Sequence, residues 1–347
     1  MRAQLLLSCL VLGACASLGS AGEGDVDLPT AGVGPFRKLA GSELLGVAPY
    51  VLDDPPSQYR EPAVLPVSAS ELYLYLVASR AGHDVLVRTH AMDARSFYGG
   101  GTAQTLPTVL AADQSWEGTE LSGPSALRVG GEVRLYYAAA GGIGLARSAD
   151  GRVFTKGAGP VLANDGATVW RAPSVAQLPD GRFSMLVSDG TSIFEAQSGD
   201  GATWTRLDAD PTTPAQDPVL GPSFASAAGP DAAAPFDGVG VTDPCVAPRV
   251  TAAGRLHFRV LYTGVGVGGT AIGYAARFGD HGPLVRAQGA VFTATTTQSA
   301  PAFLEVDGTS FMYVQDTRKG AAYPAVVGAV SPATVTLATP TAFADDP

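Results

Sequence analysis

Five segments of the chain open in the same way, and this repeat constrains the fold more than any other feature. Each opening is a proline set in a short apolar run: Glu61-Pro62-Ala63-Val64, Gly123-Pro124-Ser125-Ala126, Ala172-Pro173-Ser174-Val175, Asp243-Pro244-Cys245-Val246 and Ala300-Pro301-Ala302-Phe303. Successive opening prolines lie 62, 49, 71 and 57 residues apart. A period near 50 residues that carries several short strands is typical of a β-propeller blade.

Turn signals after the openings support strands rather than helices. Gly130-Gly131, Asp180-Gly181 and Asp307-Gly308 each separate two apolar runs, as in a hairpin. Asp150-Gly151 and Asp200-Gly201 recur in two copies of one motif, and we expect them to form turns on outer blade edges. With 43 Gly and 26 Pro and no apolar period of 3.6 residues, the chain is predicted to be all-β. We expect one five-bladed β-propeller over residues 36–347, of mostly four strands a blade, with the opening prolines nearest the axis.

The N-terminus has the features of an export signal. A charged start precedes a short apolar run that ends in Leu12-Gly13-Ala14-Cys15, which resembles a bacterial lipobox. Residues 1–14 are then a signal peptide, Cys15 is the lipidated residue, and residues 15–35 form a flexible tether. The alternative is ordinary cleavage after Ala16. The lipobox predicts a protein anchored in the bacterial cell envelope, facing the periplasm or the exterior.

Composition excludes several classes of function. A net charge of −10 and a pI near 4.8 argue against nucleic-acid partners. Besides Cys9 in the signal and Cys15, the chain has only Cys245, so no internal disulfide is expected, and Cys245 fits a buried apolar site. The four histidines show no metal-ligand spacing. We expect a monomer.

The proline openings, the Ser-x-Asp-Gly turns and the string Trp170 to Val175 together resemble the five-bladed glycosidase clan, with glycoside hydrolase family 43 as the nearest match. The resemblance implies a carbohydrate partner and three inner-strand carboxylates: a base, a residue that tunes pKa, and an acid. Glycoside hydrolysis needs at least two carboxyl groups with different pKa values. The resemblance also leaves room for a central calcium but implies no other cofactor.

Only part of that acid set is present. Glu61 precedes the first opening proline, where the family has its base, whereas Gly123 and Ala172 stand at the next two equivalent positions. Asp243 is the other inner-strand acid. We therefore name Glu61 and Asp243 as the candidate catalytic pair, although an acid before a proline also serves to accept backbone hydrogen bonds.

Further candidates surround these acids. Arg60 and Arg171 stand beside the openings and could hold a substrate carboxylate or pair with Glu61 and Asp243, while Trp170 offers a ring for stacking on a sugar. The alternative for Trp170 is packing between blades. Asp237 is placed in a loop at the same end as the site. Trp116 is a second candidate for stacking on a sugar. Glu117 and Glu120 lie in loops near the same end, and their side chains are expected to be solvated.

The sequence is compatible with three functions. The chain could be a glycoside hydrolase that uses Glu61 and Asp243, a noncatalytic sugar-binding propeller, or a scaffold for another envelope protein. A sialidase is a more distant alternative, since the segment Ser198 to Trp204 is one residue shorter than its characteristic box. The two missing acids favour the binding protein or the scaffold over the hydrolase.

Overall fold

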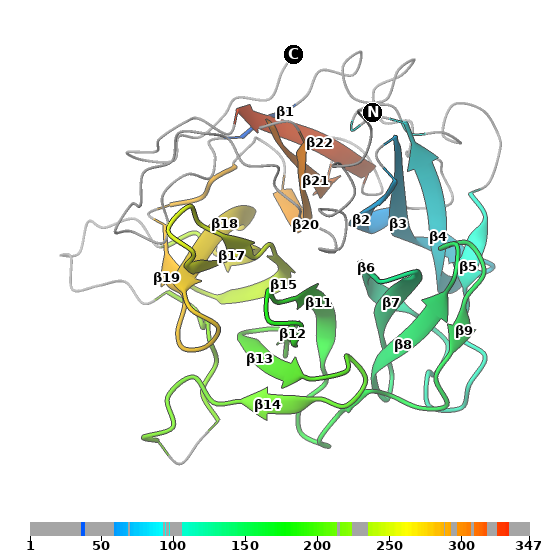
Figure 1. Ribbon diagram of the computed structural model, residues 1–347, viewed down its shortest axis with the longest axis horizontal. Coiled ribbons are helices and arrows are strands. Elements are labelled where there is room, and N and C mark those ends of the chain that lie inside the picture. The colour runs from blue at the N-terminus through cyan, green and yellow to red at the C-terminus, as the bar shows by residue number, and fades with distance from the viewer. Residues whose placement is uncertain are drawn as a thin grey trace, which may run out of the picture.

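The computed structural model describes residues 36–38, 59–68, 70–92, 94, 97, 106–213, 216–223, 235–287, 289–292, 297–306, 309–317 and 325–332. Within these ranges the chain is all-β, without helices, and has the propeller fold. Its strands form five antiparallel sheets arranged around a central axis (Figure 1).

Cys15, the signal peptide and the tether lie outside the described residues. No helix within the described ranges is long and apolar enough to cross a membrane.

Sheets 1, 2 and 3 follow one another along the chain. Sheet 1 has the order β2-β3-β4-β5, sheet 2 has β6-β7-β8-β10 with β9 also on β8, and sheet 3 has β11-β12-β13-β14. The strands are β2 (Arg60–Ser68), β3 (Glu71–Arg80), β4 (His83–Ala91), β5 (Thr108–Leu110), β6 (Ser122–Val129), β7 (Glu132–Ala139), β8 (Gly142–Ser148), β9 (Thr155–Lys156), β10 (Leu162–Ala163), β11 (Arg171–Gln177), β12 (Phe183–Ser188), β13 (Ile193–Ser198) and β14 (Thr205–Leu207).

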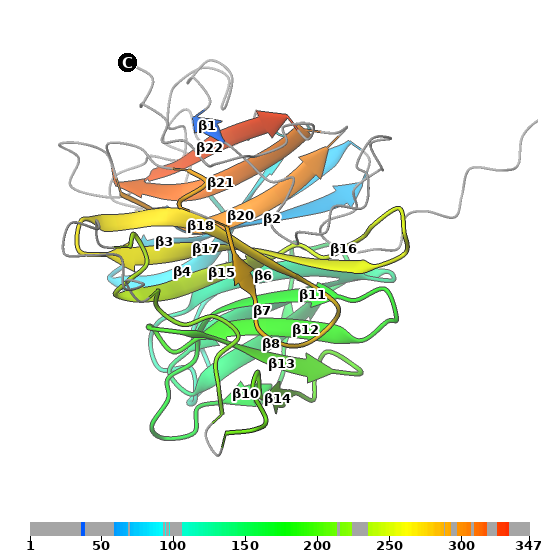
Figure 2. The same cartoon turned by 90° about the vertical axis from the view of Figure 1, so that its left-hand side faces the viewer.

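Sheets 4 and 5 complete the ring, and the last of them joins the two ends of the domain. Sheet 4 has the order β15-β17-β18-β19 with β16 also on β17, and sheet 5 has β20-β21-β22-β1. The strands are β15 (Gly240–Val246), β16 (Arg249–Val250), β17 (Leu256–Gly266), β18 (Gly269–Phe278), β19 (Val285–Arg286), β20 (Thr297–Val306), β21 (Thr309–Thr317), β22 (Ala325–Pro332) and β1 (Arg37–Lys38). The early strand β1 pairs antiparallel with the late strand β22, which ties the start of the domain to its end (Figure 2).

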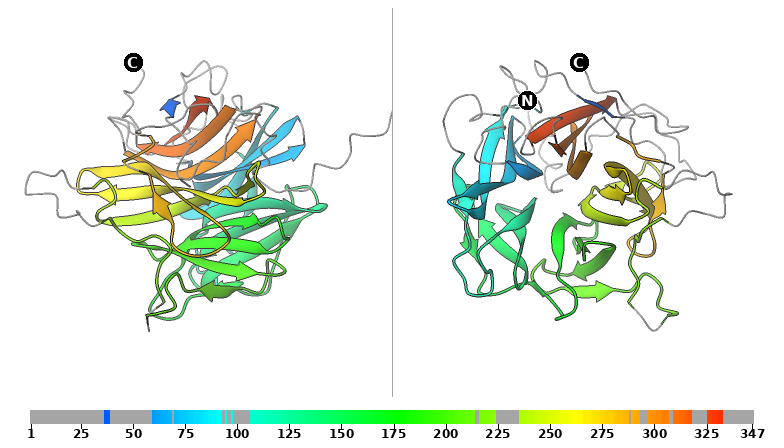
Figure 3. Two further views of the ribbon diagram at one scale, coloured as in Figure 1. Left: turned by 60° about the vertical axis from the view of Figure 1, so that its left-hand side comes forward. Right: turned by 180° about the vertical axis from the view of Figure 1, so that it is seen from behind.

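The proline openings form the innermost strand of each sheet, as predicted. β2, β6, β11, β15 and β20 point toward the centre in views from the front and from behind (Figures 1 and 3). In each of them the pairing register shifts at the proline. Proline cannot donate to a sheet ladder, so a bulge at this point lets the strand continue past it.

The residue before each opening proline has a left-handed backbone conformation. The φ values are 51° at Glu61, 56° at Gly123, 45° at Ala172, 46° at Asp243 and 51° at Ala300. Four of these five residues carry a side chain, and such a conformation strains the backbone of any non-glycine residue. We call these five residues the bulge ring.

Glycine is required at one member of the bulge ring. A Cβ atom at Gly123 would lie 2.9 Å from the Cα of Ala172, because the inner strands of sheets 2 and 3 approach closely there. Serine hydroxyl oxygens link the inner strands of sheets 2 and 3 and those of sheets 3 and 4. Ser125 Oγ accepts the N–H of Val175 at 2.9 Å, and Ser174 Oγ accepts the N–H of Val246 at 2.9 Å.

Three junctions between sheets share a tyrosine in the second strand. Its hydroxyl donates to a backbone carbonyl in the turn of the next sheet, and its ring packs edge-on to an aromatic residue of that turn. The three sets are Tyr75 with Gly151 and Phe154, Tyr136 with Gly201 and Trp204, and Tyr313 with Ala94 and Phe97. The third set closes the ring between sheets 5 and 1. Asp150 and Asp200 form the turns beneath these contacts, as predicted, by accepting backbone N–H groups.

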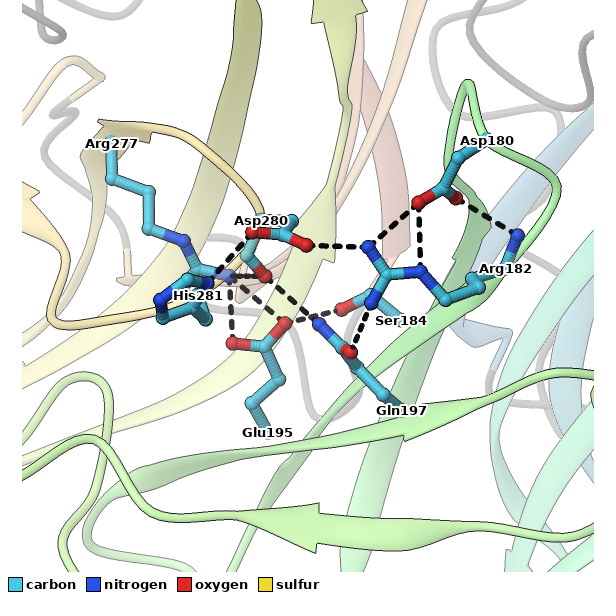
Figure 4. A network of polar contacts seen from close by, with 8 residues as sticks. All are labelled: Asp180, Arg182, Ser184, Glu195, Gln197, Arg277, Asp280 and His281. Carbon is cyan, nitrogen blue, oxygen red and sulfur yellow. Dashed lines mark hydrogen bonds and ion pairs between the residues drawn. The ribbon is translucent and has the colours of Figure 1, made fainter. Parts of the chain in front are cut away.

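The other two junctions use buried ion pairs instead. Leu186 and Leu261 occupy the strand positions that hold tyrosine elsewhere. Between sheets 3 and 4, Arg277 Nη2 lies 2.7 Å from Glu195 Oε2 and both side chains are buried (Figure 4). Between sheets 4 and 5, Arg259 makes two contacts of 3.0 Å with Glu305. Sheet 4 is therefore held on both sides by ion pairs.

Candidate functional site

The bulge ring surrounds a narrow central channel. Its walls are the opening segments of all five inner strands, from the bulge residue to the third residue after it. The channel volume is about 80 Å³. Since ligand pockets usually span about 300–1,000 Å³, the channel itself is too small to enclose a sugar ring. A saccharide could approach the acids only from the end of the channel.

Glu61 faces this channel and is held by its neighbours. Its Oε2 accepts the backbone N–H of Gly123 at 2.6 Å, and its Oε1 lies 3.6 Å from Arg60 Nε. Burial raises the pKa of Glu61, the charge of Asp243 raises it further, and the hydrogen bond from Gly123 partly opposes both effects. The side chain retains 27% exposure, which corresponds to its place at an open channel.

Asp243 occupies the equivalent position in sheet 4. Burial raises the pKa of this carboxyl group, while hydrogen bonds from the side chains of Thr263 and Thr242 and from the backbone of Ala300 oppose the shift. Glu61 therefore accepts the backbone N–H of the next bulge residue, Gly123, whereas the N–H of Ala300, the bulge residue after Asp243, donates to Thr263 Oγ1 at 2.9 Å.

The structure brings the two predicted acids to one site. Among the bulge residues only Glu61 and Asp243 carry a carboxyl group, because the other three are Gly123, Ala172 and Ala300. The charge of Asp243 is one of the causes that raise the pKa of Glu61. A carboxyl group with a raised pKa can donate a proton, but both groups here are also engaged with neighbouring protein atoms.

The two candidate arginines differ in their surroundings. Arg60 forms ion pairs with Glu61 and with Asp84 of β4, a partner that the sequence did not reveal. Arg171 is the first residue of β11 and is exposed. Within the described part of the chain, no ion pair or hydrogen bond of the Arg171 side chain is found.

The structure places Trp170 in the core rather than in the channel. Only 1% of its surface is exposed, and its ring packs edge-on to Phe194 at a centroid distance of 5.4 Å. The stacking role predicted for Trp170 is therefore replaced by the alternative, packing between sheets. The cause is positional, because the residue three places before an opening proline is buried in every sheet. These residues are Tyr59, Leu121, Trp170, Val241 and Gln298.

Asp237 also lies in the interior, which corrects its prediction as a substrate-binding residue. It is 1% exposed, accepts the hydroxyl of Tyr262 at 2.8 Å and lies 3.1 Å from Arg286 Nε. Phe236 stacks on the same tyrosine. All of these contacts are within sheet 4, so Asp237 braces the loop that leads into the inner strand.

Glu117 plays the same part in sheet 2, and its prediction as a solvated loop charge is wrong. It is 0% exposed, accepts the hydroxyl of Tyr137 at 2.7 Å and forms a 2.7 Å ion pair with Lys156. Trp116 stacks on Tyr137. Glu120, by contrast, is exposed, as expected.

Neither a reactive thiol nor a metal-ligand cluster is found at the site among the described residues. Burial raises the pKa of the Cys245 thiol to about 11, so it is protonated at neutral pH and a poor nucleophile. In the part of the chain that the structure describes, no group of three or more His, Cys, Asp or Glu is placed to hold a metal ion. A central calcium and the absence of other cofactors stay untested predictions.

Solved structures with the same fold act on carbohydrates. A glycosyl hydrolase from Bacteroides ovatus is 15% identical, covers 82% of this chain and 86% of its own, and has a TM-score of 0.58. A β-1,2-mannobiose phosphorylase from Listeria innocua, solved with β-1,2-mannobiose, is 14% identical, covers 86% and 97%, and has a TM-score of 0.60.

A third similar structure comes from the GH130 family of mannoside phosphorylases, which contains hydrolases that target β-1,2 mannosidic linkages. It is 16% identical, covers 84% of this chain and 87% of its own, and has a TM-score of 0.56. No protein-family model and no curated protein matches the chain. The comparisons thus show a β-propeller fold that this chain shares with carbohydrate-active proteins, while the resemblance to family 43 stays a prediction.

Proposed function

We propose that this chain is a five-bladed, lipid-anchored propeller of the bacterial cell envelope that binds carbohydrate at the end of its central channel without cleaving it. Each of the five sheets corresponds to one blade in this proposal. The fold shared with carbohydrate-active proteins supports the ligand class. The lipobox-like Leu12-Gly13-Ala14-Cys15 supports the anchor.

One observation supports binding over catalysis. The bulge ring contains only two acids; Glu61 already accepts the backbone N–H of Gly123, and Asp243 Oδ1 accepts the hydroxyl of Thr242 at 3.4 Å. A hydrolase needs one group to protonate the leaving oxygen and another to activate water or attack the sugar. Two carboxyl groups that are engaged with neighbouring protein atoms in a channel of about 80 Å³ have little freedom for either task.

A second candidate function is a hydrolase or phosphorylase that uses the same pair of acids. The observation in its favour is that the pKa values of Glu61 and Asp243 are both raised by burial, as a general acid requires. In that case Glu61→Gln and Asp243→Asn should each lower turnover by about 10²- to 10⁴-fold, the usual contribution of proton transfer.

The experiment that separates the two candidates measures binding and turnover on one panel. The purified chain is tested on arabinan, xylan, fructan and β-1,2-mannobiose, the last with and without inorganic phosphate. Retention in affinity electrophoresis or a calorimetric signal with no released sugar supports the proposal. Turnover that Glu61→Gln abolishes supports the enzyme, and neither binding nor turnover leaves the scaffold as the better account.

A further inference from the structure

One position before the bulge ring, each of the five inner strands carries a polar residue next to the segment that lines the channel. We call these the rim residues: Arg60, Ser122, Arg171, Thr242 and Ser299. Three of them carry hydroxyl groups, which suit the hydroxyls of a sugar. The two arginines supply the positive charges of the rim.

Arg60 and Arg171 hold the same place in sheets 1 and 3, which allows their partners to be compared. In sheet 1, Arg60 lies opposite Val77, and Val77 lies opposite Leu86 on the next strand. Asp84 is two residues before Leu86. Arg171 pairs with Ser188 and Ser188 with Ile193, so the position that matches Asp84 is Thr191.

Both acidic partners of Arg60 are thus replaced in sheet 3. Thr191 stands where sheet 1 has Asp84, and Ala172 stands where sheet 1 has Glu61. Arg60 is 18% exposed and doubly paired, whereas Arg171 is exposed and has no acidic partner among the described residues. A guanidinium at the end of the channel therefore remains available to a ligand.

We infer that the rim binds a saccharide that carries a carboxylate, a uronate, and that Arg171 pairs with that group. This inference rests on the proposed function and adds the class of ligand. A guanidinium donates two parallel N–H groups to one carboxylate, which fixes the orientation of the ligand as well as its charge.

The charges around the rim favour a ligand group with one negative charge over a group with two. Glu61 and Asp243 lie one residue beyond the rim, and Arg60 is already neutralised by Asp84 and Glu61. A carboxylate balances the one remaining arginine. A phosphate dianion would place an additional charge next to two acids and meet stronger repulsion.

The test compares trisaccharides of galacturonate, glucuronate, mannuronate and guluronate with their methyl esters, which keep the skeleton and remove the charge. Binding to the full chain is measured by calorimetry. At least one uronate should bind about 10-fold or more tightly than its ester, as expected for a charge-assisted hydrogen bond. Arg171→Gln should abolish that ratio, and Arg171→Lys should retain part of it.

Arg147→Gln is the matched control, since Arg147 is a partly exposed arginine on the outer strand β8. It should leave the uronate-to-ester ratio unchanged. A ratio of one for all four sugars, a ratio that survives Arg171→Gln, or inorganic phosphate binding more tightly than any uronate would each overturn the inference. Neutral glycans that bind without any uronate preference would leave the proposed function standing while this inference fails.

Discussion

Glu61 Oε2 accepts the backbone N–H of Gly123 at 2.6 Å, so the candidate acid of sheet 1 supports the strained inner strand of sheet 2. Glu61→Ala removes the acceptor and leaves the N–H without a partner, which should lower the free energy of unfolding by about 1–3 kcal/mol. Glu61→Gln keeps an acceptor oxygen and should cost less.

Urea unfolding measures both changes, with Glu120→Gln as the control because Glu120 is exposed. A Glu61→Ala variant as stable as the wild type would show that the contact with Gly123 is not structural.

The bulge-ring acids should also give the protein a recognisable pH dependence. The pKa values of Glu61 and Asp243 are raised above 4.5 and 3.8, mainly by burial. Between the unfolded and the folded pKa, the folded protein binds more protons than the unfolded chain, so these two groups make stability fall as pH rises. Above the folded pKa values their effect is constant.

The measurement is the free energy of unfolding from pH 3.5 to pH 8, about the range over which carboxyl groups with raised pKa titrate. The difference between wild type and the Glu61→Gln, Asp243→Asn double variant should shift in favour of the variant as pH rises. Acids with lowered pKa, such as Asp280 at about 2, act in both proteins and cancel in the difference. A difference that does not change with pH would contradict the raised pKa values.

The ion pair between Arg277 and Glu195 should be essential to the junction of sheets 3 and 4. Their side chains are 5% and 1% exposed. Glu195→Gln leaves a buried arginine without its counter-charge, which should cost about 3–5 kcal/mol. The partly exposed pair of Arg147 and Glu132 provides the control, since Arg147→Gln should cost at most about 1 kcal/mol. Thermal unfolding that responds equally to the two substitutions would contradict this role.

The proposed lipidation of Cys15 can be tested independently of the propeller. Cys15→Ser should release the protein from bacterial membranes, because anchoring comes from buried acyl chains. The fold should be unaffected, since the described strands begin at Arg37. Membrane fractionation followed by immunoblotting reads out the change, and a variant that stays with the membrane would argue for another mode of attachment.

The inner strands could be predicted from sequence because their signal is local. A proline in an apolar run needs a bulge, and five such bulges form the wall of the channel. Contacts between different strands of one sheet are not local in sequence, so the sequence does not reveal Asp84 as the partner of Arg60. Trp170 was misplaced for a related reason, since its burial depends on the neighbouring sheet.

The loop acids show a signal that could have been used. Glu117 and Asp237 each follow an aromatic residue and each stand seven positions before an opening proline. That shared spacing reflects one buried arrangement, an acid between a tyrosine and a basic residue, in sheets 2 and 4. Their charge alone predicts exposure to solvent, because acidic side chains are seldom fully buried unless they are paired.

The most direct test of the account is a proton NMR time course of the wild-type chain with each oligosaccharide of the panel. Saturation transfer from protein to sugar reports binding, and new anomeric signals report cleavage in the same sample. We predict saturation transfer to at least one sugar with no new anomeric signal over a day. Steady growth of a product signal that is lost in Glu61→Gln, or no transfer to any sugar, would contradict the claim that this propeller binds carbohydrate without cleaving it.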